Sequence, residues 1–141
     1  MGSRSAIELL LLPVRLREIR LGRPVDVLID AEAWRAIGFV VLCGDESERF
    51  LVRAAAEPRE AEIAVTSALL LLDDVEFYRG RSRSLRALLG GTVANAQHEL
   101  GVLRDLLIAP DGTVAALMVE QDGAMREIEP GGVRIEYVST A

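Results

Sequence analysis

The sequence predicts an all-β fold in which two strand-rich units pack together. Residues 100–120 read LGVLRDLLIAPDGTVAALMVE, two apolar arms on either side of Pro110-Asp111-Gly112. An Asp-Gly pair between apolar runs is a strong hairpin signal, because glycine adopts the positive φ of the turn without a clash. A similar pattern occurs earlier, around residues 38–52. Half of the 141 residues are apolar, which is enough for a hydrophobic core.

Composition argues against several functional classes. All 16 basic residues are arginine, and the 22 acidic residues give a formal net charge of -6. This balance argues against a protein whose whole surface binds nucleic acid. The single cysteine, Cys43, excludes an intramolecular disulfide and a cysteine-based zinc site. It lies in the apolar run AIGFVVLC, which favours a small buried hydrophobic side chain.

No stretch of the sequence is typical of a membrane segment or a targeting signal. No run approaches the roughly 18–20 apolar residues that span a bilayer. The apolar run after Arg4 is interrupted by Glu8, and no small-residue cleavage site follows it. Ala6 stands where a myristoylation signal has serine or threonine. We therefore expect a cytoplasmic protein without membrane insertion.

Residues 1–15 are predicted to be an N-terminal extension that forms an edge strand. Residues 7–12 are apolar apart from Glu8, and Pro13 together with the alternation after it favours extended chain over a helical turn. Alternation continues through residues 19–25. Residues 31–36, which contain the only tryptophan, are predicted to form a loop or one helical turn.

A second strong strand begins at Gly38, turns at residues 44–46 and returns through residues 49–52. The polar stretch after it contains Pro58 and is predicted to be a loop, followed by a short strand at residues 62–65. Thr66 or Ser67 can then cap a helical turn that runs through Leu72. Residues 75–78 alternate again, as in a strand.

An arginine-rich stretch separates the two halves of the chain. Residues 79–86, RGRSRSLR, contain four arginines and no acidic residue, a composition typical of a linker. We accordingly divide the chain into a first unit at residues 16–78, a linker at residues 79–84 and a second unit at residues 85–141.

The second unit repeats motifs of the first. Leu-Gly-x-x-Val at residues 21–25 matches residues 89–93, and Gly38 before FVVL matches Gly101 before VLRDLL. Each of these glycines is predicted to begin a hairpin. A unit of about 60 residues has a marginal core on its own. The two copies are therefore expected to pack face to face or to share strands.

These motifs resemble the PRC-barrel family, with the second unit the clearer match. The resemblance is carried by LGGTV at residues 89–93, ELG at 99–101, the strand at 102–108, the Asp-Gly turn and the strand at 114–119. It implies two small β-barrels, an adaptor-like role in binding other proteins and no shared catalytic residues. PRC-barrels also occur in a ribosome maturation factor, which implies a second, RNA-related role.

No pattern of reactive residues indicates an enzyme, a cofactor or a metal site. The only histidine, His98, lies in a polar loop, and Ser82 and Ser84 lack a nearby base. The acidic pairs at residues 46/48 and 73/74 do not fit a metal-binding loop. Asp105 is expected to fix local backbone geometry rather than to act as an acid or base. We therefore predict a non-catalytic protein.

The first functional hypothesis is a protein-interaction or scaffold module. Four leucines in a row exceed what one face of a strand can bury, so the surplus is covered by the second unit, by another subunit or by a second copy in a homodimer. The alternative is that the run completes the protein's own core. The candidate contact residues are Leu9, Leu10, Leu11 and Leu12.

The second hypothesis is an RNA-processing or ribosome-maturation accessory factor. It rests on a basic patch, because arginines that neutralise phosphates give salt-dependent nucleic-acid binding. The alternative is a solvated linker, or arginines that pair with the acidic flanks. The residues concerned are Arg79, Arg81, Arg83 and Arg86. The absence of lysine and the abundance of arginine, alanine, leucine and glycine indicate a GC-rich bacterial gene.

Overall fold

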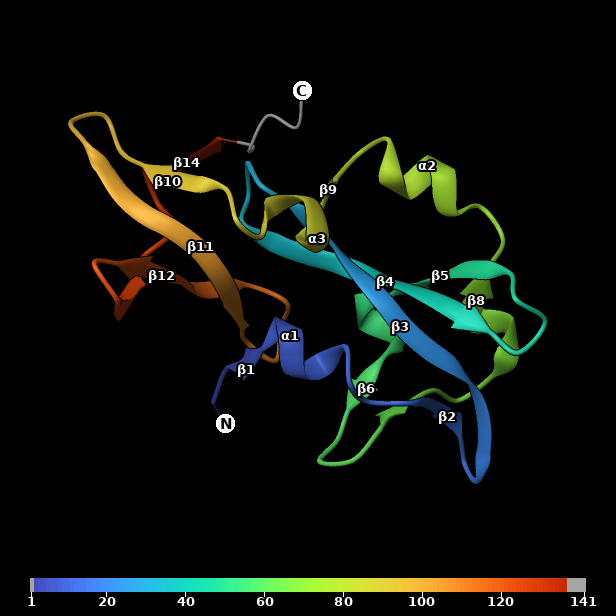
Figure 1. Ribbon diagram of the computed structural model, residues 1–141. Helices are drawn as coiled ribbons and strands as arrows, with labels where there is room; N and C mark the ends of the chain where they lie inside the picture. The colour runs from blue at the N-terminus through green and yellow to red at the C-terminus, as the bar shows by residue number, and fades with distance from the viewer. Residues whose placement is uncertain (1, 137–141) are drawn as a thin grey trace.

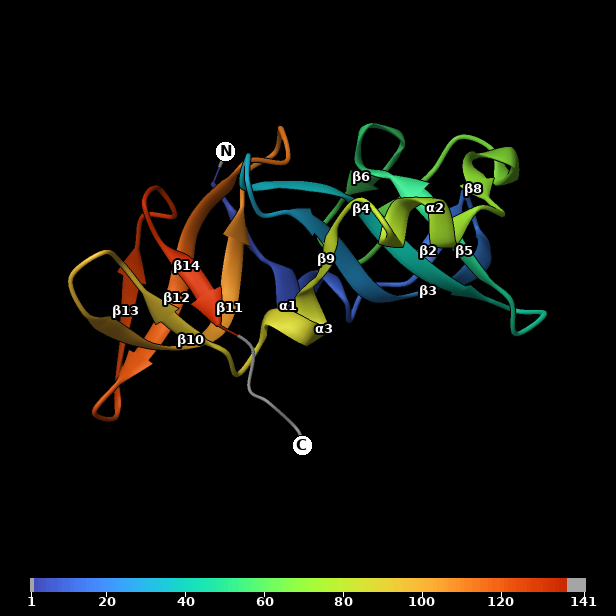
Figure 2. The same cartoon turned by 90° about the horizontal axis from the view of Figure 1, so that it is seen from above.

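The computed structural model describes residues 2–136 of the chain and confirms the predicted all-β class. Its strands form two sheets that lie side by side, with helices α1 (Ala6–Leu9) and α3 (Leu85–Leu88) in the region between them (Figures 1 and 2). Met1 and residues 137–141, the end of the predicted second unit, lie outside the described residues.

The first sheet is formed mainly by the first half of the chain. Its strand order is β6-β7-β2-β3-β4-β5-β8, and β9 pairs with β3. Most neighbours are antiparallel, whereas β2 and β7 are parallel. The strands are β2 (Val14–Leu16), β3 (Ile19–Asp30), β4 (Arg35–Cys43), β5 (Glu48–Val52), β6 (Glu57–Pro58), β7 (Ile63–Ala64), β8 (Leu71–Leu72) and β9 (Arg83–Ser84).

The second sheet contains most of the second half. Its order is β13-β12-β11-β10-β14, and β1, from the N-terminal end, pairs with β11. The strands are β1 (Arg4–Ser5), β10 (Thr92–Ala94), β11 (Glu99–Ile108), β12 (Val114–Gln121), β13 (Ala124–Ile128) and β14 (Arg134–Glu136). The remaining elements are α2 (Val75–Arg79) and the 3-10 helices η1 (Arg53–Ala55) and η2 (Ala68–Leu70).

Both predicted hairpins are confirmed. In the second half, β11 and β12 pair antiparallel around a turn in which Gly112 has φ +91. The Gly112 N–H donates to the Ala109 carbonyl at 2.9 Å, and the Ala109 N–H donates to Thr113 at 2.8 Å. In the first half, β4 and β5 pair around the predicted turn that contains Gly44. Turn chemistry and alternation are local properties, which is why sequence pattern predicts them well.

The turn between β11 and β12 makes the stability of this hairpin dependent on pH. The backbone N–H of Thr113 donates to Asp111 Oδ1 at 2.9 Å, and this bond lowers the pKa of Asp111 below its ordinary value of 3.8. The Thr113 side chain, Arg35 and Arg53 act in the same direction. A group whose pKa is lowered on folding stabilises the fold above the unfolded value and loses that effect as pH falls through the folded value.

We expect Asp111→Ala to lower the free energy of unfolding at about pH 7, and the difference from native protein to shrink at about pH 2. Urea unfolding at the two pH values measures both differences. The matched control is Glu127→Ala, which removes an exposed acidic side chain that lies within strand β13 rather than in a turn. A difference for Asp111→Ala that stays constant across this range would contradict the expectation.

The N-terminal apolar run forms a short helix and a turn rather than extended chain, so the predicted edge strand is wrong for residues 7–12. Only Arg4–Ser5 form a strand before α1. The Ser5 side chain caps α1 by accepting the Glu8 N–H at 3.2 Å, and the chain then turns through residues 10–13 before β2 begins. A four-residue helix has little stability of its own, and here tertiary contacts supply it.

The segment around the predicted linker is also more ordered than expected. Residues 75–78, predicted as a strand, belong to helix α2, where Tyr78 stacks on Phe50 with ring centroids 3.9 Å apart. Arg83–Ser84, predicted to end the linker, form β9 on the first sheet. Ser67 caps a helical turn as predicted, because its side chain accepts the Leu69 N–H at the start of η2. The turn ends at Leu70, however, and Leu71–Leu72, predicted to belong to it, form β8.

The predicted match between Gly38 and Gly101 is wrong, because the hairpin of β11 and β12 corresponds to that of β3 and β4 rather than to that of β4 and β5. Gly38 is in β4, the second strand of the β3–β4 hairpin, whereas Gly101 is in β11, the first strand of the β11–β12 hairpin. The counterpart of Gly101 is Gly22 in β3. A Cβ at Gly22 would lie 2.4 Å from the Leu42 carbonyl, and one at Gly101 would lie 2.4 Å from the Glu120 carbonyl.

One hydrophobic core serves both sheets. A single cluster of buried side chains contains Val27, Phe39 and Leu51 from the first sheet together with Leu103 and Leu117 from the second. Burial of such side chains stabilises each by roughly 1.5–3 kcal/mol. The two halves are therefore joined by shared packing rather than by the chain alone.

Candidate functional site

Asp26 lies in β3 and holds the start of helix α3. Only 8% of the residue is exposed. Its Oδ1 accepts the Arg86 N–H at 3.2 Å and the Val27 N–H at 2.9 Å, and its Oδ2 accepts the Ser84 hydroxyl. Ser84 Oγ in turn accepts the Ala87 N–H at 3.3 Å. A strand carboxylate thus supplies partners for the unsatisfied N–H groups of a helix start.

Asp105 makes the same set of bonds in the second sheet. Its Oδ1 accepts the Ile7 N–H at 3.1 Å and the Leu106 N–H at 2.7 Å, and its Oδ2 accepts the Ser5 hydroxyl. Asp105 was expected to fix local backbone geometry, and its bond to the Leu106 N–H is local. Its bonds to Ser5 and Ile7 instead hold a segment that lies far away in the sequence. We call the Asp26–Ser84 and Asp105–Ser5 arrangements the two clasps.

The clasps position backbone and leave no chemistry for a substrate. Both oxygens of each carboxylate already accept hydrogen bonds from the protein, and these bonds hold the helix start in place. The role of Asp26 was missed at the level of sequence. A signal for it exists, because Leu-Gly-x-x-x-Asp occurs both at residues 21–26 and at residues 100–105.

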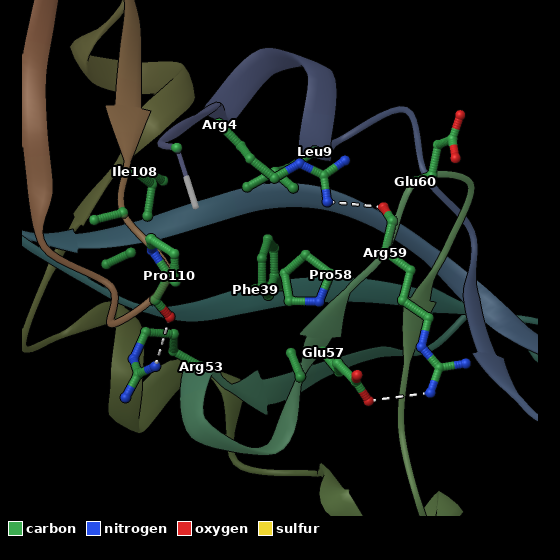
Figure 3. A pocket seen from close by; sticks show the side chains of 14 residues that line it. Arg4, Leu9, Phe39, Arg53, Glu57, Pro58, Arg59, Glu60, Ile108 and Pro110 are labelled. Carbon is green, nitrogen blue, oxygen red and sulfur yellow. Dashed lines mark hydrogen bonds and ion pairs between the residues drawn. The ribbon is translucent and has the colours of Figure 1, made fainter.

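A pocket of about 510 Å³ opens between the two sheets (Figure 3). Leu9 from α1, Phe39 from β4 and Ile108 from β11 form its apolar lining, and Pro58 and Pro110 stand at its sides. Leu9, Phe39 and Ile108 also belong to the shared core, so the lining is part of the packing that joins the two sheets. The volume lies within the range of about 300–1,000 Å³ typical of ligand sites.

Arginines surround this pocket. Arg4 Nη1 donates to the Arg59 carbonyl at 2.7 Å, and Arg53 Nη1 approaches the Pro110 carbonyl at 3.4 Å. Arg59 pairs with Glu57 at 3.1 Å. Within residues 2–136, neither Arg4 nor Arg53 forms an ion pair with a carboxylate within 4.0 Å, and the charge of Arg53 acts on Asp111 from a longer distance. An apolar lining with a few charged groups is the usual composition of a binding site.

The leucine run lies mostly inside the molecule. Leu9 is 3% exposed and lines the pocket, while Leu10 and Leu12 pack against the shared core. Leu11 alone projects outward, with 78% of its surface exposed. Three of the four leucines therefore contribute to the protein's own core, which was the alternative to a partner contact.

The structure does not gather the four arginines of the predicted basic patch into one free surface. Arg79 pairs with Glu76 at 2.7 Å and with Glu48 at 2.9 Å, and the Glu48 hydrogen bond raises the pKa of Arg79. Arg81 lies over the Phe77 ring at 3.9 Å. The other two donate to carbonyl groups, Arg83 to Ile135 and Arg86 to Val25.

The remaining candidates lie apart from the pocket. His98 is exposed in the loop before Leu100. Burial raises the pKa of the Cys43 thiol, which keeps it protonated and poorly nucleophilic near neutral pH. Among the described residues, no three His, Cys, Asp or Glu side chains are grouped so that they could hold a metal ion. No helix within residues 2–136 has the length and apolar character that crossing a bilayer requires.

Comparison with known proteins gives no assignment. No model of a known protein family matches the chain, and no characterised protein matches its sequence. The residues of the pocket and the clasps are therefore the basis for a functional proposal.

Proposed function

We propose that this protein is a non-catalytic protein-interaction module, of the PRC-barrel type that its second half resembles. Its binding site is the pocket between the sheets, and its ligand is an apolar segment of a protein partner. The observation that carries the proposal is the apolar lining of Leu9, Phe39 and Ile108, which opens to solvent on a two-sheet body.

The rim supports a protein ligand rather than a purely hydrocarbon one. Arg4 and Arg53 present donors to the carbonyl or carboxylate groups of a bound chain, and Glu57 and Glu60 present acceptors. Aromatic and aliphatic side chains of a partner would fill the apolar part, as the anchors of protein interfaces do. A single cysteine is in keeping with the reducing bacterial cytoplasm in which we place the protein.

We expect Ala56→Trp to abolish binding, because Ala56 lines the pocket and a tryptophan there occupies the space of a ligand side chain. Peptides selected from a random display library on the native protein are synthesised and titrated by fluorescence polarisation. Their Kd should rise at least tenfold in the Ala56→Trp variant.

The matched control is Ala115→Trp, which adds the same side chain to an exposed position on β12 away from the pocket. Circular dichroism verifies that both variants are folded. Failure to enrich any peptide, or equal binding by native and Ala56→Trp protein, would reject the pocket as the binding site.

A further inference from the structure

Two segments of the chain have the same design and dock in the same way. The N-terminal arm, residues 4–10, reads RSAIELL, and the internal arm, residues 83–89, reads RSLRALL. Each forms a two-residue strand and then a four-residue helix, and each is held by a clasp. Ser5 pairs with Leu107 and Ser84 pairs with Leu28 in the two sheets.

Equivalent residues of the two arms, and of the two surfaces on which they dock, are separated by the same number of positions in the sequence. Arg4 and Arg83 are 79 positions apart (83 minus 4), and so are Asp26 and Asp105 (105 minus 26). The same separation relates Ser5 to Ser84, Leu9 to Leu88, Leu10 to Leu89, Val14 to Val93, Gly22 to Gly101, Leu28 to Leu107 and Ile29 to Ile108. The chain therefore contains two copies of one pair, which consists of an arm and the surface on which it docks.

Each arm docks on one sheet, and the chain after it continues into strands of the other sheet. The N-terminal arm leads into β2 and β3 of the first sheet but docks on β11 of the second. The internal arm leads into β10 and β11 but docks on β3. This is a reciprocal exchange of arms within one chain, in which each sheet receives the arm of the other (Figure 2).

The two arms differ in how they are tethered. The internal arm lies between helix α2 and strand β10, and the N-terminal arm is joined to β2 through residues 10–13. That connection is short, contains Pro13 and carries the exposed Leu11. Short hinges of this kind allow an arm to dock on a neighbouring copy with the same contacts.

We propose that the surface on β11 formed by Asp105, Leu107 and Ile108 also binds the N-terminal arm of a second copy of this chain, giving a dimer by reciprocal exchange. The contacts are the same atoms within and between chains, with Ala6 and Leu9 as the buried anchors. In the dimer, the two connections at residues 10–13 would lie against each other and shield Leu11 from solvent. Because Arg4 and Leu9 line the pocket, each pocket of the dimer contains residues of both copies.

Mixed disulfide formation tests this exchange. Arg4 and Ile108 are paired across β1 and β11, and their counterparts Arg83 and Ile29 are paired across β9 and β3. In a Cys43→Ser background, Arg4→Cys protein is mixed with Ile108→Cys protein, concentrated, oxidised and analysed on a non-reducing gel. The expected product is a covalent dimer that contains one chain of each kind.

The matched control is a mixture of Arg83→Cys and Ile29→Cys proteins, whose arm is tethered on both sides. It should give at least fivefold less covalent dimer. Equal amounts from the two mixtures, or no dimer from the first when a single chain carrying both Arg4→Cys and Ile108→Cys does oxidise, would overturn the proposal.

If the Arg4→Cys/Ile108→Cys double variant does not oxidise, a second measurement tests for the dimer without a disulfide. Light scattering of the native protein from micromolar to millimolar concentration should show an increasing fraction with twice the monomer mass. The Ser5→Ala variant removes the clasp hydroxyl of the arm. Because the closed monomer and the exchanged dimer both contain this clasp, the variant should leave the dimer fraction nearly unchanged and shorten the time needed to reach it. A native protein that remains monomeric throughout would reject the exchanged dimer.

Discussion

Asp26→Ala is expected to destabilise the protein by about 3 kcal/mol, because it removes the acceptor for several donors at once. The Ser84 hydroxyl and the N–H groups of Val27 and Arg86 all bond to this carboxylate, which is 8% exposed. A buried donor without a partner costs roughly 1–3 kcal/mol, and several are created here. The loss is expected as a lower midpoint in urea at unchanged slope.

Two comparisons make this result specific to the clasp. Asp105→Ala removes the same set of bonds at a half-buried position, so its effect should have the same sign and a smaller size. Glu127→Ala, an exposed acid on β13, should change stability by less than about 0.5 kcal/mol. A loss below about 1 kcal/mol for Asp26→Ala would show that water replaces the carboxylate and that the clasp contributes little.

Gly101→Ala is expected to destabilise the protein by roughly 2–5 kcal/mol. Gly101 has φ +136, which an L side chain rarely adopts. A Cβ there would lie 2.4 Å from the Glu120 carbonyl and 2.7 Å from Val119 Cγ1, so backbone strain adds to overpacking. Both atoms belong to β12, so the main hairpin of the second sheet has to distort.

Two other glycines separate the contributions of strain and close approach. Gly123 has φ +81 but open space where a Cβ would lie, so Gly123→Ala should cost about 1–2 kcal/mol from backbone strain alone. Gly44 has neither constraint, and Gly44→Ala should be nearly neutral. Urea unfolding of the three variants should rank them in this order, and a Gly101→Ala protein as stable as Gly44→Ala would contradict the interpretation.

The clasps connect the stability of the fold to its proposed use. The Asp105 clasp holds the N-terminal arm on β11, and that arm supplies Arg4 and Leu9 to the pocket. The Asp26 clasp holds the corresponding arm on β3, between the sheets, where α3 joins the shared core through Leu85 and Leu88. Weakening either clasp is thus expected to loosen the junction at which the pocket lies.

The sequence by itself determined the strand content and the two hairpins. The turns at Pro110-Asp111-Gly112 and at Gly44 are formed by residues that are neighbours in the chain. Alternating apolar residues place one face of each strand toward a core. These features depend on contacts between residues close together in the chain.

Only the tertiary structure decided the path of the arms and the place of the pocket. Residues 7–12 satisfy the pattern of a buried strand as well as that of a helix, and the choice depends on Asp105, almost a hundred positions away, which accepts the Ile7 N–H. The burial of Asp26 and the apolar junction of Leu9, Phe39 and Ile108 likewise combine distant segments. Local preference in a four-residue helix is too weak to fix such elements, so long-range hydrogen bonds and packing determine them.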